Sequence, residues 1–200
     1  VQPPRPEAVK TRRTLFNDDE YAEQVAKFKN KPIFHFKGLS DEQVFNMIPG
    51  PAVARTCLIV LGNEPDAKTK GCPVCGTDIY KGRNGFYPWI LDSNNPWKVT
   101  CPNCKTSFPS NDWANGDMSS GDFPDDGFGC EPAKPHIMPN GQPSRWPFIA
   151  YYHQTQAYMR QFIPGITEAA FSGLANNDKE ALHLAAIALF RYAESMLDMS

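Results

Sequence analysis

The chain has 200 residues, enough for one domain with a hydrophobic core or for one domain and a small appendage, since domains usually have about 100–200 residues. Hydrophobic residues make up 41%, charged residues 21%, and the mean hydropathy is −0.47, so the composition is that of a soluble globular protein and not of a disordered one. A net charge of −2, from 20 basic and 22 acidic residues, gives no global attraction to nucleic acid or to an anionic membrane. No apolar run approaches the roughly 18 residues of a membrane span.

The first region, residues 1–50, is expected to hold a proline-rich extended arm and two helices. Asn17 is a helix cap followed by three acidic residues, which predicts a helix over about 18–30. Ser40-Asp41-Glu42-Gln43 has the pattern of a capping box and predicts a second, shorter helix that stops before Pro49.

The second region, residues 51–143, has a different pattern. Glycine, proline, asparagine, aspartate and aromatic residues are scattered through it without a steady period. This distribution predicts loops, turns and short strands. The two best strand candidates are residues 78–80 and residues 97–100, and both lie beside cysteines.

The third region, residues 144–200, is predicted to be helical. Aromatic residues recur on one face from Phe148 to Phe162, and Pro164-Gly165 is expected to end that helix, with a short helix to follow. A long alanine-rich helix then begins near Asp178, which makes an antiparallel helical pair. The residues expected to face inward on it are Leu182, Ala185, Ala186, Leu189, Phe190, Ala193 and Leu197. It reaches Ser200 without a glycine cap, so we expect the chain to stop inside a larger, mainly α architecture.

Four of the six cysteines form two paired motifs, Cys72-Pro-Val-Cys75 and Cys101-Pro-Asn-Cys104. A two-residue step lets both thiolates of one turn face inward, and two such turns complete a tetrahedron around a metal ion. Zinc is the expected ion. Four thiolates fill every coordination position, so the predicted site is structural and cannot activate water.

Disulfide bonds are the alternative interpretation of these cysteines, because an exported protein would meet oxidising conditions. The proline after the first cysteine of each pair favours the metal site over a disulfide framework. Cys57 lies in an apolar run and is expected to be a buried thiol. Cys130 is expected to be an ordinary buried or free cysteine, because four ligands suffice.

Paired cysteine motifs also occur in nucleic-acid-binding modules, and the local charge argues against that role here. Only three basic residues lie between Cys75 and Cys101, and the segment 111–131 carries six acidic residues and no basic one. Phosphate groups would be repelled there. We therefore expect no nucleic-acid partner and no membrane partner.

Several stretches together resemble the N-terminal part of bacterial heparinase II/III-like and alginate-lyase-like proteins that carry a CPxCG insertion. These stretches are Leu39-Ser40-Asp41-Glu42-Gln43-Val44, Gly71-Cys72-Pro73-Val74-Cys75-Gly76, Tyr87-Pro88-Trp89, Trp97-Lys98-Val99-Thr100-Cys101-Pro102-Asn103-Cys104 and Phe108-Pro109-Ser110-Asn111-Asp112. Weaker helical matches follow at Ala150-Tyr151-Tyr152 and from Leu174 to Ala181. The resemblance implies the start of an (α/α) toroid with an embedded, loop-rich zinc ribbon.

The same resemblance implies a secreted or periplasmic polysaccharide lyase that cleaves uronate-containing acidic polysaccharides by β-elimination. Such a reaction needs a neutralised carboxylate, a general base and a general acid. The family's catalytic groups match no position of this chain, so the catalytic residues stay unknown and are expected beyond residue 200. Tyr152, His153 and His136 are the only candidates to test, and packing or surface roles are expected for them.

Two other functions stay open at the level of the sequence. One is a non-catalytic, zinc-stabilised module that binds a glycan or a protein, and the other is a glycoside hydrolase on a toroid, which would need a pair of carboxylates. The four tryptophans, Trp89, Trp97, Trp113 and Trp146, suit either a core or a sugar-stacking surface, with the core favoured. The acidic segment 117–126 is expected to be a solvated loop and not a calcium site.

Overall fold

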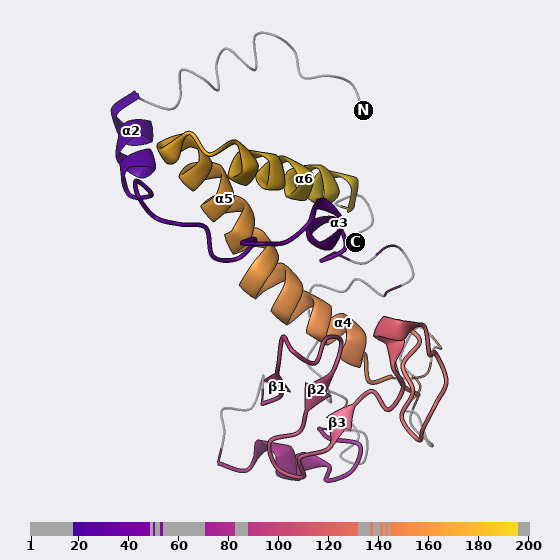
Figure 1. The fold of residues 1–200 in the computed structure, drawn as a ribbon. Helices are drawn as coiled ribbons and strands as arrows, with labels where there is room; N and C mark the ends of the chain where they lie inside the picture. Colours follow the sequence, from indigo (N-terminus) through magenta and orange to yellow (C-terminus); the bar gives the residue numbers. More distant parts are fainter. Residues whose placement is uncertain are drawn as a thin grey trace.

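The structure is a computed structural model that describes residues 18–48, 50, 53, 71–82, 88–131, 137, 141, 143 and 145–195. Its described part has a helical region and a small-sheet region, which one long helical rod connects (Figure 1). The rod comprises α4 (Phe148–Tyr152), the π-helix η3 (His153–Phe162) and α5 (Ile163–Asn176), which follow one another without a break. Within the described part of the chain, no helix is both long enough and apolar enough to cross a bilayer.

In the helical region, α2 (Asp18–Ala26) packs against α5, and α3 (Asp41–Phe45) packs against α6 (Lys179–Ser195). Both predicted N-terminal helices are present, and α2 is shorter than predicted because the chain tightens into i→i−3 turns after it. The predicted capping box of α3 is confirmed. Gln43 N donates to Ser40 Oγ over 3.2 Å, and Ser40 N donates to Gln43 Oε1 over 2.9 Å.

The sheet region contains three antiparallel strands in the order β1 (Ile90–Leu91), β2 (Val99–Thr100) and β3 (Ser107–Phe108). The strand predicted over 97–100 is therefore present in its second half. The strand predicted over 78–80 is wrong, because residues Thr77–Tyr80 form the 3₁₀-helix η1. The preceding cysteine turn starts this helix, since Asp78 N donates to the carbonyl of Cys75 over 3.2 Å.

The buried side chains form two clusters, one in each region. In the sheet region, the rings of Phe108 and Phe148 stack with centroids 5.0 Å apart, and Trp89 meets both rings edge-on. In the helical region, Phe36 and Phe162 pack together with centroids 6.4 Å apart. The rod contributes Phe148 to one cluster and Phe162 to the other, so it belongs to both cores.

The predicted helix end at Pro164-Gly165 is wrong, because the rod continues through both residues. Pro164 occupies the first turn of α5, where the helix changes from π to α geometry. Because proline has no N–H, the rod lacks one backbone hydrogen bond at this position, which is where the hydrogen-bond pattern changes from i→i+5 to i→i+4. Gly165 is buried, and a Cβ atom there would overlap the ring of Phe36, so the glycine permits close packing and does not stop the helix.

The antiparallel helical pair is confirmed as α5 and α6, but the predicted inward face of α6 is partly wrong. Its buried residues are Ala181, Leu184, Ala185, Ala188 and Ser195, and Leu182 packs half-buried against Gly173. By contrast, Leu189 is 50% and Phe190 63% exposed, and Ala186 and Ala193 are also exposed. The side of α6 that carries Leu184 and the buried alanines packs against α5 and α3, and Leu189 and Phe190 lie on its exposed side. Leu197 lies outside the described residues.

The mainly α prediction holds only loosely. The described residues give one helical hairpin with two short helices beside it, and a three-stranded sheet near a cysteine cluster. An (α/α) toroid is not shown.

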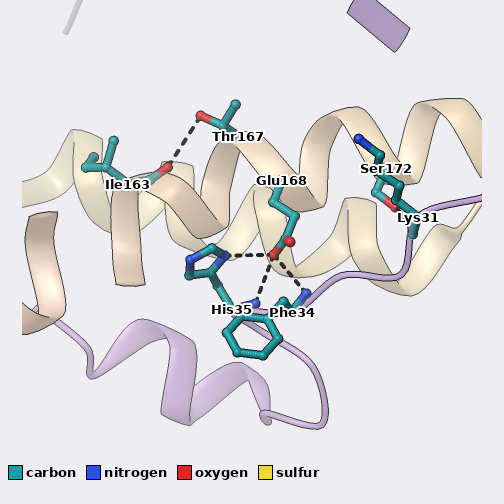
Figure 2. A network of polar contacts seen from close by, with 7 residues as sticks. All are labelled: Lys31, Phe34, His35, Ile163, Thr167, Glu168 and Ser172. Carbon is teal, nitrogen blue, oxygen red and sulfur yellow. Dashed lines mark hydrogen bonds and ion pairs between the residues drawn. The ribbon is translucent and has the colours of Figure 1, made fainter. Parts of the chain in front are cut away.

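A carboxylate clasp fixes the segment before α3 to the rod (Figure 2). Glu168 Oε2 accepts hydrogen bonds from Phe34 N at 2.8 Å, from His35 N at 2.9 Å and from the His35 ring Nδ1 at 2.9 Å. One turn further along α5, Ser172 Oγ donates to the carbonyl of Lys31 over 2.8 Å. Burial opposes ionisation of Glu168, but the hydrogen bonds from His35 and Phe34 outweigh it and lower the pKa of the carboxyl group.

Candidate metal centre

The first cysteine turn is a tight loop closed by its own backbone. Cys72 N donates to the carbonyl of Gly76 over 3.0 Å, and Gly76 N donates to the carbonyl of Cys72 over 2.8 Å. Gly71 has a φ of 78°, and a Cβ atom there would overlap the backbone of Gly76, so only glycine fits. Val74 N also donates to Cys72 Sγ over 3.4 Å, which places the positive end of an N–H dipole at the sulfur.

The second cysteine turn is the connection between β2 and β3. Cys101 N donates to the carbonyl of Thr106 over 2.9 Å, and Lys105 N donates to the carbonyl of Cys101 over 3.0 Å. Cys104 Sγ lies 3.4 Å from Thr106 Oγ1, within hydrogen-bond range. The short strands thus carry this turn on a fixed hairpin and aim its two thiols toward the first turn.

The two turns bring the four predicted ligands together. Sγ atoms of Cys72, Cys75, Cys101 and Cys104 all lie within 4.8 Å of one another. Two separations of 3.6 Å run between the turns, from Cys72 to Cys104 and from Cys75 to Cys101. Sulfurs on a tetrahedron with Zn–S bonds of about 2.3 Å are separated by about 3.8 Å, so the geometry fits zinc.

The four cysteines are free thiols in the structure. A disulfide needs an S–S distance of about 2.05 Å, far shorter than the distances in this cluster. The structure therefore favours the predicted metal site over the disulfide alternative.

The surroundings of the sulfurs suit a bound cation. Cys72 and Cys101 are buried, and burial raises the pKa of both thiols. Burial acts in the same direction on Cys104, but hydrogen bonding with Thr106 and the neighbouring thiols lowers its pKa to about 7. A divalent ion supplies the charge that deprotonates coordinating thiols even in a buried site. The donor set is what a thiolate-binding ion such as Zn²⁺ requires.

Trp146 connects the cysteine cluster to the segment that leads into the rod. Its Nε1 atom donates to the carbonyl of Gly71 over 3.1 Å, directly before the first cysteine turn. Its backbone N–H donates to the carbonyl of Cys130, and its carbonyl accepts from Cys130 N, both over 2.8 Å.

The two remaining cysteines lie outside the paired motifs. Cys130 is buried, and burial raises the pKa of its thiol to about 11, as expected for an ordinary buried cysteine. Cys57 lies outside the described residues.

The acidic segment is only partly the solvated loop that was predicted. Asp125 is fully buried, and its carboxylate accepts hydrogen bonds from Gly127 N, Gly129 N and Ile149 N over 2.8–3.1 Å. Asn111 holds the same segment from the other side by donating to the carbonyl of Asp125 over 2.8 Å. The carboxylate thus orders the loop and the start of α4, a role that charge counting missed.

Two of the three residues considered as catalytic candidates, Tyr152 and His153, are described by the structure, and both have the packing role that was expected. Tyr152 and His153 are buried in the rod, beside the ring of Trp97. Burial, followed by the charge of Asp92, raises the pKa of Tyr152 to about 12, so this phenol stays protonated. His136 lies outside the described residues.

A shallow groove of about 410 Å³ runs between α3, η3 and the β1–β2 connection. We call it the Trp97 groove; its lining includes Glu42, Gln43, Asn46, Ser93, Trp97 and Tyr152. Trp97 has a φ of 67°, which is unusual for an aromatic residue, and ring contacts with Trp113 and Tyr152 hold it. Trp89 and Trp146 are buried in the core of the sheet region, as predicted. Trp97 and Trp113 are half-buried and pack against the same core, and Trp97 also lines the groove.

Comparison with known proteins found no family model, no curated protein and no solved structure that matches the chain. The lyase resemblance is therefore carried by the motif stretches alone. The candidate metal centre is identified by the geometry of its four cysteines alone.

Proposed function

We propose that the chain binds one Zn²⁺ ion through Cys72, Cys75, Cys101 and Cys104, and that this ion holds the sheet region together. The observation that carries the proposal is the convergence of four free thiols from two separate turns within 4.8 Å. Four thiolates complete a tetrahedral shell, which leaves no position for water or substrate. The proposed ion is thus structural.

Metal analysis tests this proposal directly. Purified protein is expected to contain one zinc ion per chain, and a strong chelator is expected to release it and to expose four additional titratable thiols. A Cys75→Ser variant should lose the zinc, whereas the matched control Cys130→Ser should keep it. Protein without bound metal, or with a disulfide between Cys72 and Cys75, would contradict the proposal.

We propose in addition that the zinc-stabilised unit contacts a polysaccharide. The supporting observation is the Trp97 groove, where the half-buried ring of Trp97 lies among amide, hydroxyl and carboxylate groups. Aromatic faces pack on the apolar face of a sugar ring, and the polar groups suit its hydroxyls. Together with the motif resemblance, this groove supports the wider hypothesis of a secreted or periplasmic lyase that acts on acidic polysaccharides, with its catalytic groups beyond residue 200.

Product analysis separates the three functions that the sequence left open. A longer protein that contains this chain is expected to release unsaturated uronate products from acidic polysaccharides, measured by ultraviolet absorbance. Binding on a glycan array without turnover would instead support the non-catalytic module, and saturated products would support a hydrolase. The Trp97→Ala variant should weaken glycan binding, whereas Phe128→Ala, which changes an exposed aromatic residue outside the groove, should leave it unchanged.

A further inference from the structure

The π-helix η3 controls which side chains share a face of the rod. An α-helix has about 3.6 residues per turn, so residues nine positions apart, about two and a half turns, lie on opposite sides. The i→i+5 hydrogen bonds of a π-helix widen the turn to about 4.4 residues, so the same nine positions make about two turns. Consequently Tyr151, Thr155 and Arg160 come to one side of the rod, where all three line one cavity.

This cavity, which we call the Arg160 pocket, has a volume of about 410 Å³ and lies between β1 and η3. Leu91, Met159 and the buried rings of Trp89 and Tyr151 form an apolar wall. The polar lining consists of Gln154, Thr155 and Arg160. Volume and composition are those of a small-molecule site, which combines apolar walls with a few polar groups.

The charge of the Arg160 pocket is opposite to that of the Trp97 groove on another side of η3. Among the described residues, the pocket lining includes one guanidinium and no carboxylate, whereas the groove lining includes the carboxylate of Glu42 and no basic side chain. The side chain of Arg160 is exposed, and no described carboxylate pairs with it. An arginine that pairs with no carboxylate of the described residues, at the edge of an apolar pocket, suits a ligand carboxylate, which it can hold with two parallel hydrogen bonds.

We infer that the Arg160 pocket binds a ring-bearing carboxylate, with the ring against the apolar wall and the carboxylate on Arg160. For a polysaccharide the matching unit is a uronate. This inference rests on the second proposed function, glycan contact, and assigns the acidic units of that glycan to this pocket. The Trp97 groove, with its own negative charge, is left for uncharged parts of the ligand.

Calorimetry on the zinc-loaded chain tests the inference with three probes: a uronate oligosaccharide, a neutral glucose oligosaccharide of equal length, and benzoate. Arg160→Gln is expected to weaken binding of the uronate oligosaccharide and of benzoate about tenfold, because a charge-assisted hydrogen bond is lost. Arg160→Lys should retain part of the affinity, and binding to the unchanged protein should weaken as salt is added. Arg145→Gln is the matched control, since Arg145 is paired with Glu131 and lies outside the pocket lining.

The outcomes distinguish the inference from the function on which it rests. Uronate binding that Arg160→Gln leaves unchanged but Trp97→Ala abolishes would overturn the pocket assignment and support glycan contact. Benzoate binding that depends on Arg160, without binding of either oligosaccharide, would support the carboxylate site and contradict the glycan proposal. Failure of all three probes to bind would overturn both.

Discussion

The helical region and the sheet region are held together by different means. In the helical region, α5 and α6 satisfy their own backbone hydrogen bonds and pack through buried apolar side chains. The three strands of the sheet region have two residues each, so they supply few backbone hydrogen bonds. Other contacts connect the segments of this region: the four cysteines converge, and buried polar side chains such as Asp125 and Asn111 make hydrogen bonds between loops. The cysteine cluster, which is the candidate metal site, thus lies in the region where regular backbone structure is scarce.

Metal removal should produce the largest effect and should act on one region first. Apparent free energies of structural zinc binding are about 10–16 kcal/mol, as large as the whole stability of a typical domain, so the sheet region should unfold. Hydrogen exchange after chelation should show loss of protection at Cys101 N, while amides of α6 around Leu184 keep theirs. Simultaneous loss of protection in both regions would show that they unfold as one unit.

Truncation of matched leucines on α6 tests the helical core and its corrected face. Leu184 is 3% exposed and Leu189 is 50% exposed. Leu184→Ala should lower the free energy of unfolding by about 2–4 kcal/mol, because it leaves a cavity. Leu189→Ala should change it by less than about 0.5 kcal/mol. Denaturant titration followed by circular dichroism measures both, and zinc content should be unchanged in each variant. Equal losses would contradict the observed orientation of α6.

Acidification should have a smaller effect, through the clasp of Glu168 on Phe34 and His35. The pKa of this carboxyl group is lower in the folded chain than its ordinary value of 4.5, so its stabilisation is present above pH 4.5 and is lost as the pH falls through the folded pKa. Glu168→Gln should cost about 1 kcal/mol at neutral pH. The difference in unfolding free energy between the original protein and this variant should shrink as the pH falls below 4.5. Glu20→Gln, on the exposed surface of α2, is the control and should show no such trend.

The features that local sequence determines were the ones that could be predicted. A capping box needs only Ser40 and Gln43, and the structure contains both of its hydrogen bonds. The cysteine turns are also local, because two residues between thiols fix their relative direction, and the four thiols do converge. The Arg160 pocket had no such local signal, since it depends on a π-helix that brings together residues nine positions apart.

The wrong predictions concern residues whose role depends on distant neighbours. Pro164 and Gly165 have the local pattern of a helix end, but Phe36 packs against Gly165 and the helix continues. Asp125 was expected to be solvated like the other acidic residues of its segment, but it is buried and accepts a hydrogen bond from the backbone N–H of Ile149. On α6, Phe190 was expected to face inward, but it is exposed, and the buried positions include Leu184 and Ala188.

The unbroken rod also fixes how the two halves of the molecule are rotated against each other. Phe148 anchors one end in the aromatic cluster of the sheet region, and Phe162 anchors the other end in the helical core. Rewinding η3 into α geometry would twist these anchors by roughly half a turn, since about two turns would become about two and a half. Such a rotation would pull Phe148 or Phe162 out of its core. The packing of these two rings therefore opposes any change of η3 from π to α geometry.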